Sequence, residues 1–127
     1  MALRCLLVDN DARFLESAKL LLNREGVDID TASSGAQAIQ QIGMVRPDVV
    51  LLDIHLGKES GFSVVRELHA VWPTDGAAES NGARIILIST YSEGDYGRLI
   101  ETSPVLGFIA KSALSAHAIR ALLASAP

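Results

Sequence analysis

Polar side chains suited to metal or phosphate chemistry follow several apolar stretches of this sequence. Asp9 ends "LRCLLVD", Asp53 ends "DVVLLD", Ser89 and Thr90 end "RIILIST", and Lys111 comes directly after "VLGFIA". A carboxylate can attack phosphorus and form an acyl phosphate, which gathers negative charge at one place. These carboxylates, hydroxyls and one ammonium lie far apart in the chain, so the fold has to bring them together.

Each member of this set has a role in phosphoryl chemistry. Mg²⁺ prefers oxygen ligands and binds through one or two carboxylates together with a phosphoryl oxygen. A lysine and a hydroxyl can contact the remaining phosphoryl oxygens. We therefore predict that Asp53 is the nucleophile, that Asp9 is a metal ligand, and that Lys111 and Ser89 bind the phosphoryl group.

Five strands and five helices are expected to position these residues. The apolar runs predict strands over residues 3–9, 27–32, 48–53, 84–89 and 105–110. Apolar residues at helical spacing follow each strand. In the first helix this spacing predicts that Phe14, Leu21 and Leu22 face the core. The fourth helix, over residues 93–103, has the weakest signal because Gly97 interrupts it.

The alternation of strands and helices predicts an α/β fold. Central strands that are apolar on both faces indicate a parallel sheet covered by helices on each side. Right-handed crossovers then give a three-layer sandwich. The carboxyl ends of all the strands meet at one edge of such a sheet, where functional crevices lie.

Composition limits the classes of function. The 127 residues suit one domain, and the net charge of -4 without a basic cluster argues against direct nucleic-acid binding. No segment approaches the roughly 20 apolar residues of a membrane helix. Cys5 is the single cysteine, which excludes an internal disulfide and fits a cytoplasmic location. Because it falls in a predicted strand, we expect it to be buried and inert.

The segments "LLVDND", "PDVVLLDIHLGKESGF", "IILIST" and "GFIAKSAL" together resemble the receiver domain of two-component response regulators. The resemblance covers almost all of residues 1–127. It implies a flavodoxin-like sandwich with five parallel strands in the order 2-1-3-4-5 and five helices.

The resemblance also implies the chemistry of the site. Asp53 would accept a phosphoryl group from a sensor histidine kinase. Asp9, Asp53 and the backbone carbonyl of His55 would hold Mg²⁺. Asn10 stands where the family usually has a second acid, so we expect a weaker Mg²⁺ site that uses its amide oxygen.

Other positions match the switch of the family. Ser89 matches the switch hydroxyl, Phe108 the switch aromatic residue, and Lys111 the invariant-type lysine. The fourth helix, fifth strand and fifth helix would then present a changed surface to an output domain, a partner protein or a second copy in a homodimer. Such a domain is not an enzyme in the usual sense, since it promotes only its own phosphotransfer and dephosphorylation.

The pair Lys111 and Ser112, with "STYSE" before it, further resembles receivers that precede LuxR-type DNA-binding domains. That likeness implies a role in transcription regulation.

Two other hypotheses remain at this point. A pseudo-receiver would have the same fold but respond to protein contact, with Asn10 as its mark. A small haloacid-dehalogenase-like phosphohydrolase would use "VDND", with Asp9 as nucleophile and Asp11 as acid/base, although Arg13 stands where a threonine is expected. Asp11 is better explained as the N-cap of the first helix.

Overall fold

The computed structural model describes residues 3–72, 84–90 and 96–125. The loop predicted over residues 73–83, the first part of the predicted fourth helix, and Tyr91 lie outside these ranges. No helix in the described part of the chain is long and apolar enough to span a membrane.

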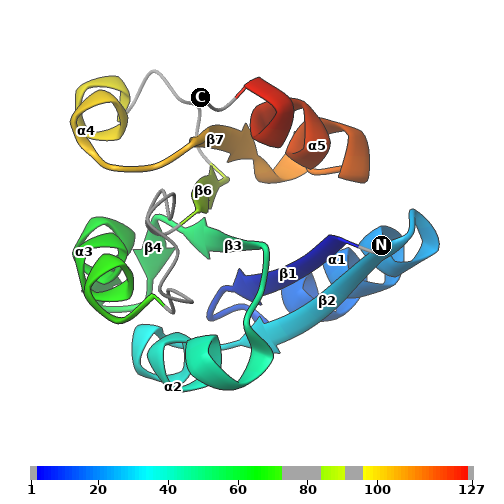
Figure 1. Cartoon of the computed structure of the whole chain (residues 1–127), viewed down its shortest axis with the longest axis horizontal. Coiled ribbons are helices and arrows are strands. Elements are labelled where there is room, and N and C mark those ends of the chain that lie inside the picture. The colour runs from blue at the N-terminus through cyan, green and yellow to red at the C-terminus, as the bar shows by residue number, and fades with distance from the viewer. Residues whose placement is uncertain (1–2, 73–83, 91–95, 126–127) are drawn as a thin grey trace, which may run out of the picture.

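Five parallel strands form the central sheet (Figure 1). They are β1 (Leu3–Val8), β2 (Val27–Ala32), β3 (Val49–Asp53), β6 (Ile85–Ser89) and β7 (Gly107–Ala110). The order β2-β1-β3-β6-β7 confirms the predicted 2-1-3-4-5 arrangement, with the Asp53 strand in the middle. The strands β3, β6 and β7 begin one or two residues later than predicted. For instance, β3 begins at Val49 and not at Asp48, whose side chain accepts a hydrogen bond from the backbone N–H of Arg4 (2.9 Å).

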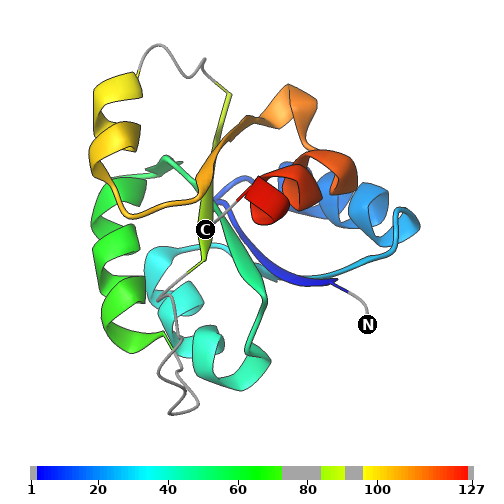
Figure 2. The ribbon, with the colours of Figure 1, turned by 45° about the horizontal axis from the view of Figure 1, so that its top comes forward.

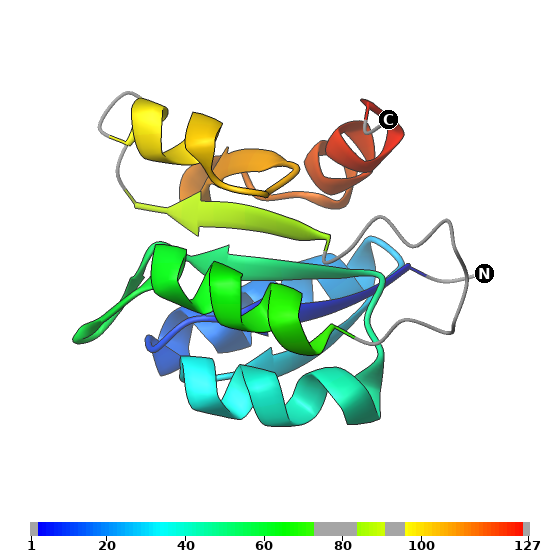
Figure 3. The same cartoon turned by 60° about the vertical axis from the view of Figure 1, so that its left-hand side comes forward.

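Helices cover both faces of the sheet, as predicted. Helices α1 (Ala12–Arg24) and α5 (Ala116–Ser125) lie on one face, whereas α2 (Gly35–Val45), α3 (Gly61–Val71) and α4 (Gly97–Thr102) lie on the other (Figures 2 and 3). The N-terminal residues of the helices explain where several of them begin. Asp11, Ser34 and Ser115 each accept a backbone hydrogen bond from the first turn of the helix that follows.

Each helical layer encloses an apolar core against the sheet. The buried residues of the α1/α5 core are Cys5, Leu7, Ala18, Leu22, Val27, Ile29, Val49, Leu51, Ile86, Ile88, Ile109, Leu114, Ala116 and Ile119. Those of the α2/α3/α4 core are Leu6, Val8, Ala32, Ala38, Ile42, Val50, Leu52, Ile54, Leu56, Val64, Val65, Leu68, Ile85 and Leu87. Burial raises the pKa of the Cys5 thiol to about 12, so the thiol stays protonated and inert as predicted.

Two details of the helices correct the sequence prediction. Leu21 was expected in the core but is 46% exposed, because Ala18 and Leu22, four residues apart, form the buried stripe of α1 and Leu21 lies beside it. Gly97 was expected to interrupt the fourth helix, yet it is the first residue of α4. Glycine destabilises a helix through its backbone entropy, and at the first position it does not interrupt the residues that follow.

A short antiparallel hairpin follows Asp53 and was not predicted. It consists of β4 (His55–Leu56) and β5 (Glu59–Ser60). Glu59 Oε1 accepts a hydrogen bond from the backbone N–H of Gly35 at the start of α2 (3.1 Å). This bond fixes the hairpin beside the carboxyl edge of the sheet.

Candidate functional site

Side-chain alternation along the strands sends Asp9, Asp53 and Lys111 toward the same helical layer. Each stands two positions after a buried residue of the α1/α5 core, namely Leu7, Leu51 and Ile109 respectively. Lys111 begins a short 3-10 turn (Lys111–Ala113) directly after β7. Three separate strands therefore place two carboxylates and one ammonium close together at the carboxyl edge of the sheet.

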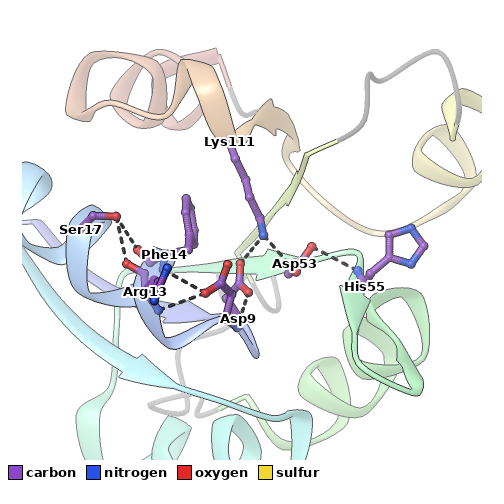
Figure 4. A network of polar contacts seen from close by, with 8 residues as sticks. Asp9, Arg13, Phe14, Ser17, Asp53, His55 and Lys111 are labelled. Atoms are coloured by element: carbon purple, nitrogen blue, oxygen red, sulfur yellow. Dashed lines mark hydrogen bonds and ion pairs between the residues drawn. The ribbon is translucent and has the colours of Figure 1, made fainter.

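The three side chains are in direct contact (Figure 4). Lys111 Nζ lies 2.6 Å from Asp9 Oδ2 and 3.3 Å from Asp53 Oδ2. The second oxygen of each acid accepts a backbone hydrogen bond, Asp9 Oδ1 from Asp11 (2.9 Å) and Asp53 Oδ1 from His55 (3.2 Å). Asp9 is completely buried and Asp53 is 5% exposed, so both carboxylates are held in fixed orientations.

Phe14 also contacts the site, through its aromatic face. The Lys111 ammonium lies 4.5 Å from the centroid of the Phe14 ring, which is a cation–π contact. The sequence predicted Phe14 only as a core residue of the first helix. Its half-buried position between the α1/α5 core and Lys111 gives it a second role, which helical periodicity cannot reveal.

The charges of the site shift two pKa values. Burial raises the pKa of the Asp53 carboxyl, and the neighbouring Asp9 carboxylate raises it further, against the opposing effects of the His55 N–H and Lys111. Burial alone would lower the pKa of Lys111, but the contacts with Asp9 and Asp53 outweigh it and the pKa is raised. Lys111 therefore remains charged beside the acids.

Ser89 and Thr90 lie on the same cavity as Asp53. This cavity has a volume of about 190 Å³ and is lined by Asp53, His55, Ser89, Thr90 and Lys111. Ser89 is fully buried, whereas Thr90 is exposed. The convergence predicted from the strand ends is thus what the structure shows, with Ser89 nearer than Thr90 to the interior.

Phe108 lies apart from this cavity. It pairs with Leu87 across β6 and β7 and packs, half-buried, against the α2/α3/α4 core. It also lines a second, apolar cavity of about 540 Å³ between β7 and α5. Since Ser89 follows Leu87 by two positions, Ser89 and Phe108 belong to the same face of the sheet.

The oxygen atoms around Asp9 and Asp53 determine whether a metal ion fits. Asp9 Oδ2 is buried and, among the described residues, has no aligned hydrogen-bond donor, although the Lys111 ammonium lies close. Asn10 is exposed at the same loop, and its amide nitrogen faces the turn at Gly57. In the described ranges no three acidic, histidine or cysteine side chains gather. This donor set suits Mg²⁺, which binds few carboxylates and keeps several waters.

Tyr96, at the start of α4, contacts the site through His55. The Tyr96 hydroxyl hydrogen-bonds to His55 Nε2, and Tyr96 packs half-buried on the α2/α3/α4 core, whereas His55 is exposed. The pair links residues 41 positions apart in the chain. No local pattern in the sequence signals such a contact.

The chain is similar to known signalling proteins over most of its length. Residues 5–123 match the family described as response regulator receiver domain. The DNA-binding response regulator MtrA of Mycobacterium tuberculosis is 40% identical over 70 residues, which are 55% of this chain and 31% of that protein. The matched segment is therefore less than a third of that relative.

Solved structures share the fold. A response regulator protein from Burkholderia pseudomallei, with a phosphorylated aspartic acid, calcium ion and citrate, superposes with a TM-score of 0.76 at 23% identity, covering 95% of this chain and 66% of that one. The response regulator protein TrrA from Thermotoga maritima, in complex with Mg(2+)-BeF, has a TM-score of 0.69 at 29% identity and covers 85% of both chains.

Proposed function

We propose that this chain, which belongs to the family of response regulator receiver domains, is switched by phosphorylation of Asp53. One observation carries the proposal: Asp53 lines a cavity of about 190 Å³ with Ser89 and Lys111, and Lys111 also binds the buried Asp9. A carboxylate, an ammonium and a hydroxyl around a small cavity are the groups that phosphoryl transfer to an acid requires.

The donor is a phosphohistidine of a sensor kinase. An oxygen of Asp53 attacks phosphorus, the phosphorus–nitrogen bond breaks, and its electron pair stays on the imidazole. Lys111 and Ser89 contact the oxygens of the transferred group. Water later attacks phosphorus, the bond to the Asp53 oxygen breaks, and inorganic phosphate leaves. The chain acts only on its own aspartyl phosphate and turns over no separate substrate.

Asp9, Asp53, the amide oxygen of Asn10 and the backbone carbonyl of His55 would hold Mg²⁺. When bound, the ion supplies positive charge against the phosphoryl oxygens. Two related structures, named for a phosphorylated aspartic acid with calcium and for Mg(2+)-BeF, support this assignment. The chain's own contribution is to fix the two carboxylates, through the backbone N–H groups of Asp11 and His55.

The output of the switch is a changed surface. In this proposal Ser89 moves toward the phosphoryl group, Phe108 turns further into the space that it leaves, and the surface of α4, β7 and α5 changes. That surface would meet an output domain, another protein or a second copy of the chain. The domain itself would bind neither nucleic acid nor membrane and would work in the cytoplasm. A link to a LuxR-type DNA-binding domain, and so to transcription, stays a prediction.

The two alternative hypotheses differ in their support. The hydrolase requires Asp11 as acid/base, but Asp11 accepts hydrogen bonds from the backbone N–H groups of Arg13 and Phe14 as the N-cap of α1. Asn10 is the observation that favours the pseudo-receiver, since it removes one charge from the metal site.

Binding of Mg²⁺ and beryllofluoride separates the receiver from the pseudo-receiver. We expect the two together to raise the thermal unfolding midpoint of the parent, because ligands that bind only the folded state stabilise it. Asp9→Asn and Asp53→Asn should each abolish most of that rise. A parent midpoint that does not respond would contradict the proposed switch and favour regulation by protein contact.

A further inference from the structure

We propose that Tyr96 is a positioning residue, which holds His55 in place beside the phosphoacceptor cavity and so controls how long the phosphoryl group stays on Asp53. This inference rests on the proposed function and adds to it a link between α4 and the site. It concerns the contact between Tyr96 and His55, which come from different elements of the fold.

The contact between Tyr96 and His55 is specific in its geometry. The Tyr96 hydroxyl hydrogen-bonds to His55 Nε2, and the two rings meet edge to face with centroids 5.5 Å apart at 64°. Tyr96 also lies against Phe62 of α3, with centroids 6.5 Å apart. Tyr96 is therefore supported by the body of the protein and can in turn hold His55 in place.

His55 connects this contact to the reacting carboxylate. Its backbone N–H donates to Asp53 Oδ1 (3.2 Å), and the residue lines the cavity beside Asp53 and Ser89. Its ring is turned away from the Asp53 carboxylate (Figure 4). One residue thus orients the phosphoacceptor with its backbone and contacts the start of α4 with its side chain.

Within the part of the chain that the structure describes, α4 has few other attachments, chiefly the packing of Ile100 on the α2/α3/α4 core. None of its six residues is buried. Beyond its C-terminal end, His69 of α3 hydrogen-bonds to the carbonyl oxygen of Pro104 (2.7 Å). The start of α4 is held by Tyr96, so movement of α4 would pull on the cavity wall through the Tyr96 hydroxyl.

Loss of the Tyr96 hydroxyl should therefore speed loss of the phosphoryl group. Without that hydrogen bond His55 is held less firmly, and a shift of this residue opens the cavity that it lines, so water gains access to phosphorus. Because the coupling between two sites is reciprocal, phosphorylation of Asp53 would also shift α4 less in this variant than in the parent.

A double-mutant cycle tests this coupling. The parent, Tyr96→Phe, His55→Ala, the double variant and the control Ser103→Ala are phosphorylated with acetyl phosphate and Mg²⁺. The decay of the adduct is then followed by intact mass. Ser103→Ala is matched, because it removes one hydroxyl hydrogen bond, to the carbonyl of Leu99 (2.6 Å), at the opposite end of α4. For each of these proteins we also measure the thermal unfolding midpoint and the hydrogen exchange over residues 96–102, both without phosphodonor.

We expect Tyr96→Phe and His55→Ala to shorten the adduct lifetime by a similar factor of about three or more, the effect of one hydrogen bond. The double variant should match the single variants, Ser103→Ala should match the parent, and His55→Ala should speed exchange over residues 96–102. Effects that multiply in the double variant would overturn the proposal, because the residues would then act independently. So would a change in thermal midpoint without a change in lifetime.

The cycle also distinguishes failure of the inference from failure of the proposed function. A parent that takes no adduct contradicts phosphorylation at Asp53 and, with it, any control of the adduct by Tyr96. A parent that is phosphorylated, with unchanged exchange over residues 96–102 in His55→Ala, contradicts the coupling alone.

Discussion

Asp53 is a residue whose surroundings oppose its own charge. Burial and the nearby Asp9 carboxylate raise its pKa, and Lys111 offsets them only in part. The proposed phosphorylation accounts for this conflict, because an oxygen that attacks phosphorus has to be ionisable and has to lie at a cavity that admits the phosphoryl group. The same conflict lowers the stability of the unphosphorylated fold, which leads to the first prediction.

Asp53→Asn should raise the thermal unfolding midpoint, measured without divalent cations. The folded pKa of Asp53 lies above the unfolded value of about 3.9. The stability that comes from protonated Asp53 is fully present below the unfolded pKa and is lost as pH rises through the folded pKa. The amide side chain of the variant never ionises, so its advantage over the parent should grow from pH 4 to pH 8. A midpoint below that of the parent at pH 8 would mean that the Lys111 contact dominates.

Phe14 should affect phosphorylation through Lys111. Replacing Phe14 by Leu removes the aromatic face under the ammonium, a contact worth about 0.5–1 kcal/mol at exposed sites. We expect acetyl phosphate to phosphorylate the variant about two- to fivefold more slowly, while Phe14→Tyr, which keeps the ring, behaves like the parent. Equal rates for Phe14→Leu and Phe14→Tyr would limit Phe14 to core packing.

Strand ends explain which site residues the sequence could reveal. Asp9, Asp53, Ser89 and Lys111 could be predicted because each ends or follows an apolar run, and parallel strands end at one edge. Phe14 and Tyr96 could not, since their contacts cross between elements and depend on side-chain directions that one-dimensional periodicity does not contain.

Some features of the helices and strands could be predicted from the sequence, and others could not. The N-cap Asp11 could be predicted from the sequence, because a short polar side chain before an apolar stripe often caps a helix. The β4–β5 hairpin could not, because two-residue strands contain too few residues to show a period. Leu21 was misplaced since an apolar residue at the edge of a stripe looks the same as one at its centre.

Two glycines in helices should respond oppositely to alanine. At Gly61, the first residue of α3, an added Cβ would clash with the backbone oxygen of Asp53 and lie 2.8 Å from Ile54 Cα. At Gly43 in α2 it would meet nothing within 4 Å. We expect Gly61→Ala to lower the free energy of unfolding by about 1–3 kcal/mol and Gly43→Ala to raise it by about 0.5–1 kcal/mol.

Urea unfolding of the two variants and the parent checks this pair. Gly61→Ala should also slow phosphorylation, because the backbone that it displaces carries Asp53, whereas Gly43→Ala should not. Equal stabilities of the two variants would show that the backbone after Asp53 can shift to accommodate the added methyl group and does not fix the carboxylate.

At the scale of the whole molecule, stability is unevenly distributed. The middle strands β3 and β6 are buried at every position, whereas α4 has no buried residue. A rigid sheet that holds the reacting groups beside a weakly attached helix is an arrangement suited to a switch.

Hydrogen exchange should follow this distribution. We expect the amides of β3 and β6 to exchange only through global unfolding, and those of α4 to exchange fastest among the helices, because few contacts must break to expose them. Exchange detected by mass spectrometry, peptide by peptide, checks the order. Protection of α4 equal to that of α3 would argue against its role as the element that moves.

The central claim is that Asp53 accepts a phosphoryl group despite Asn10. Its most direct test is the intact mass of the chain after incubation with acetyl phosphate and Mg²⁺, with Asp53→Asn treated alongside. We predict one phosphoryl adduct on the parent and none on the variant. An unmodified parent, or an adduct that persists in Asp53→Asn, would contradict the account.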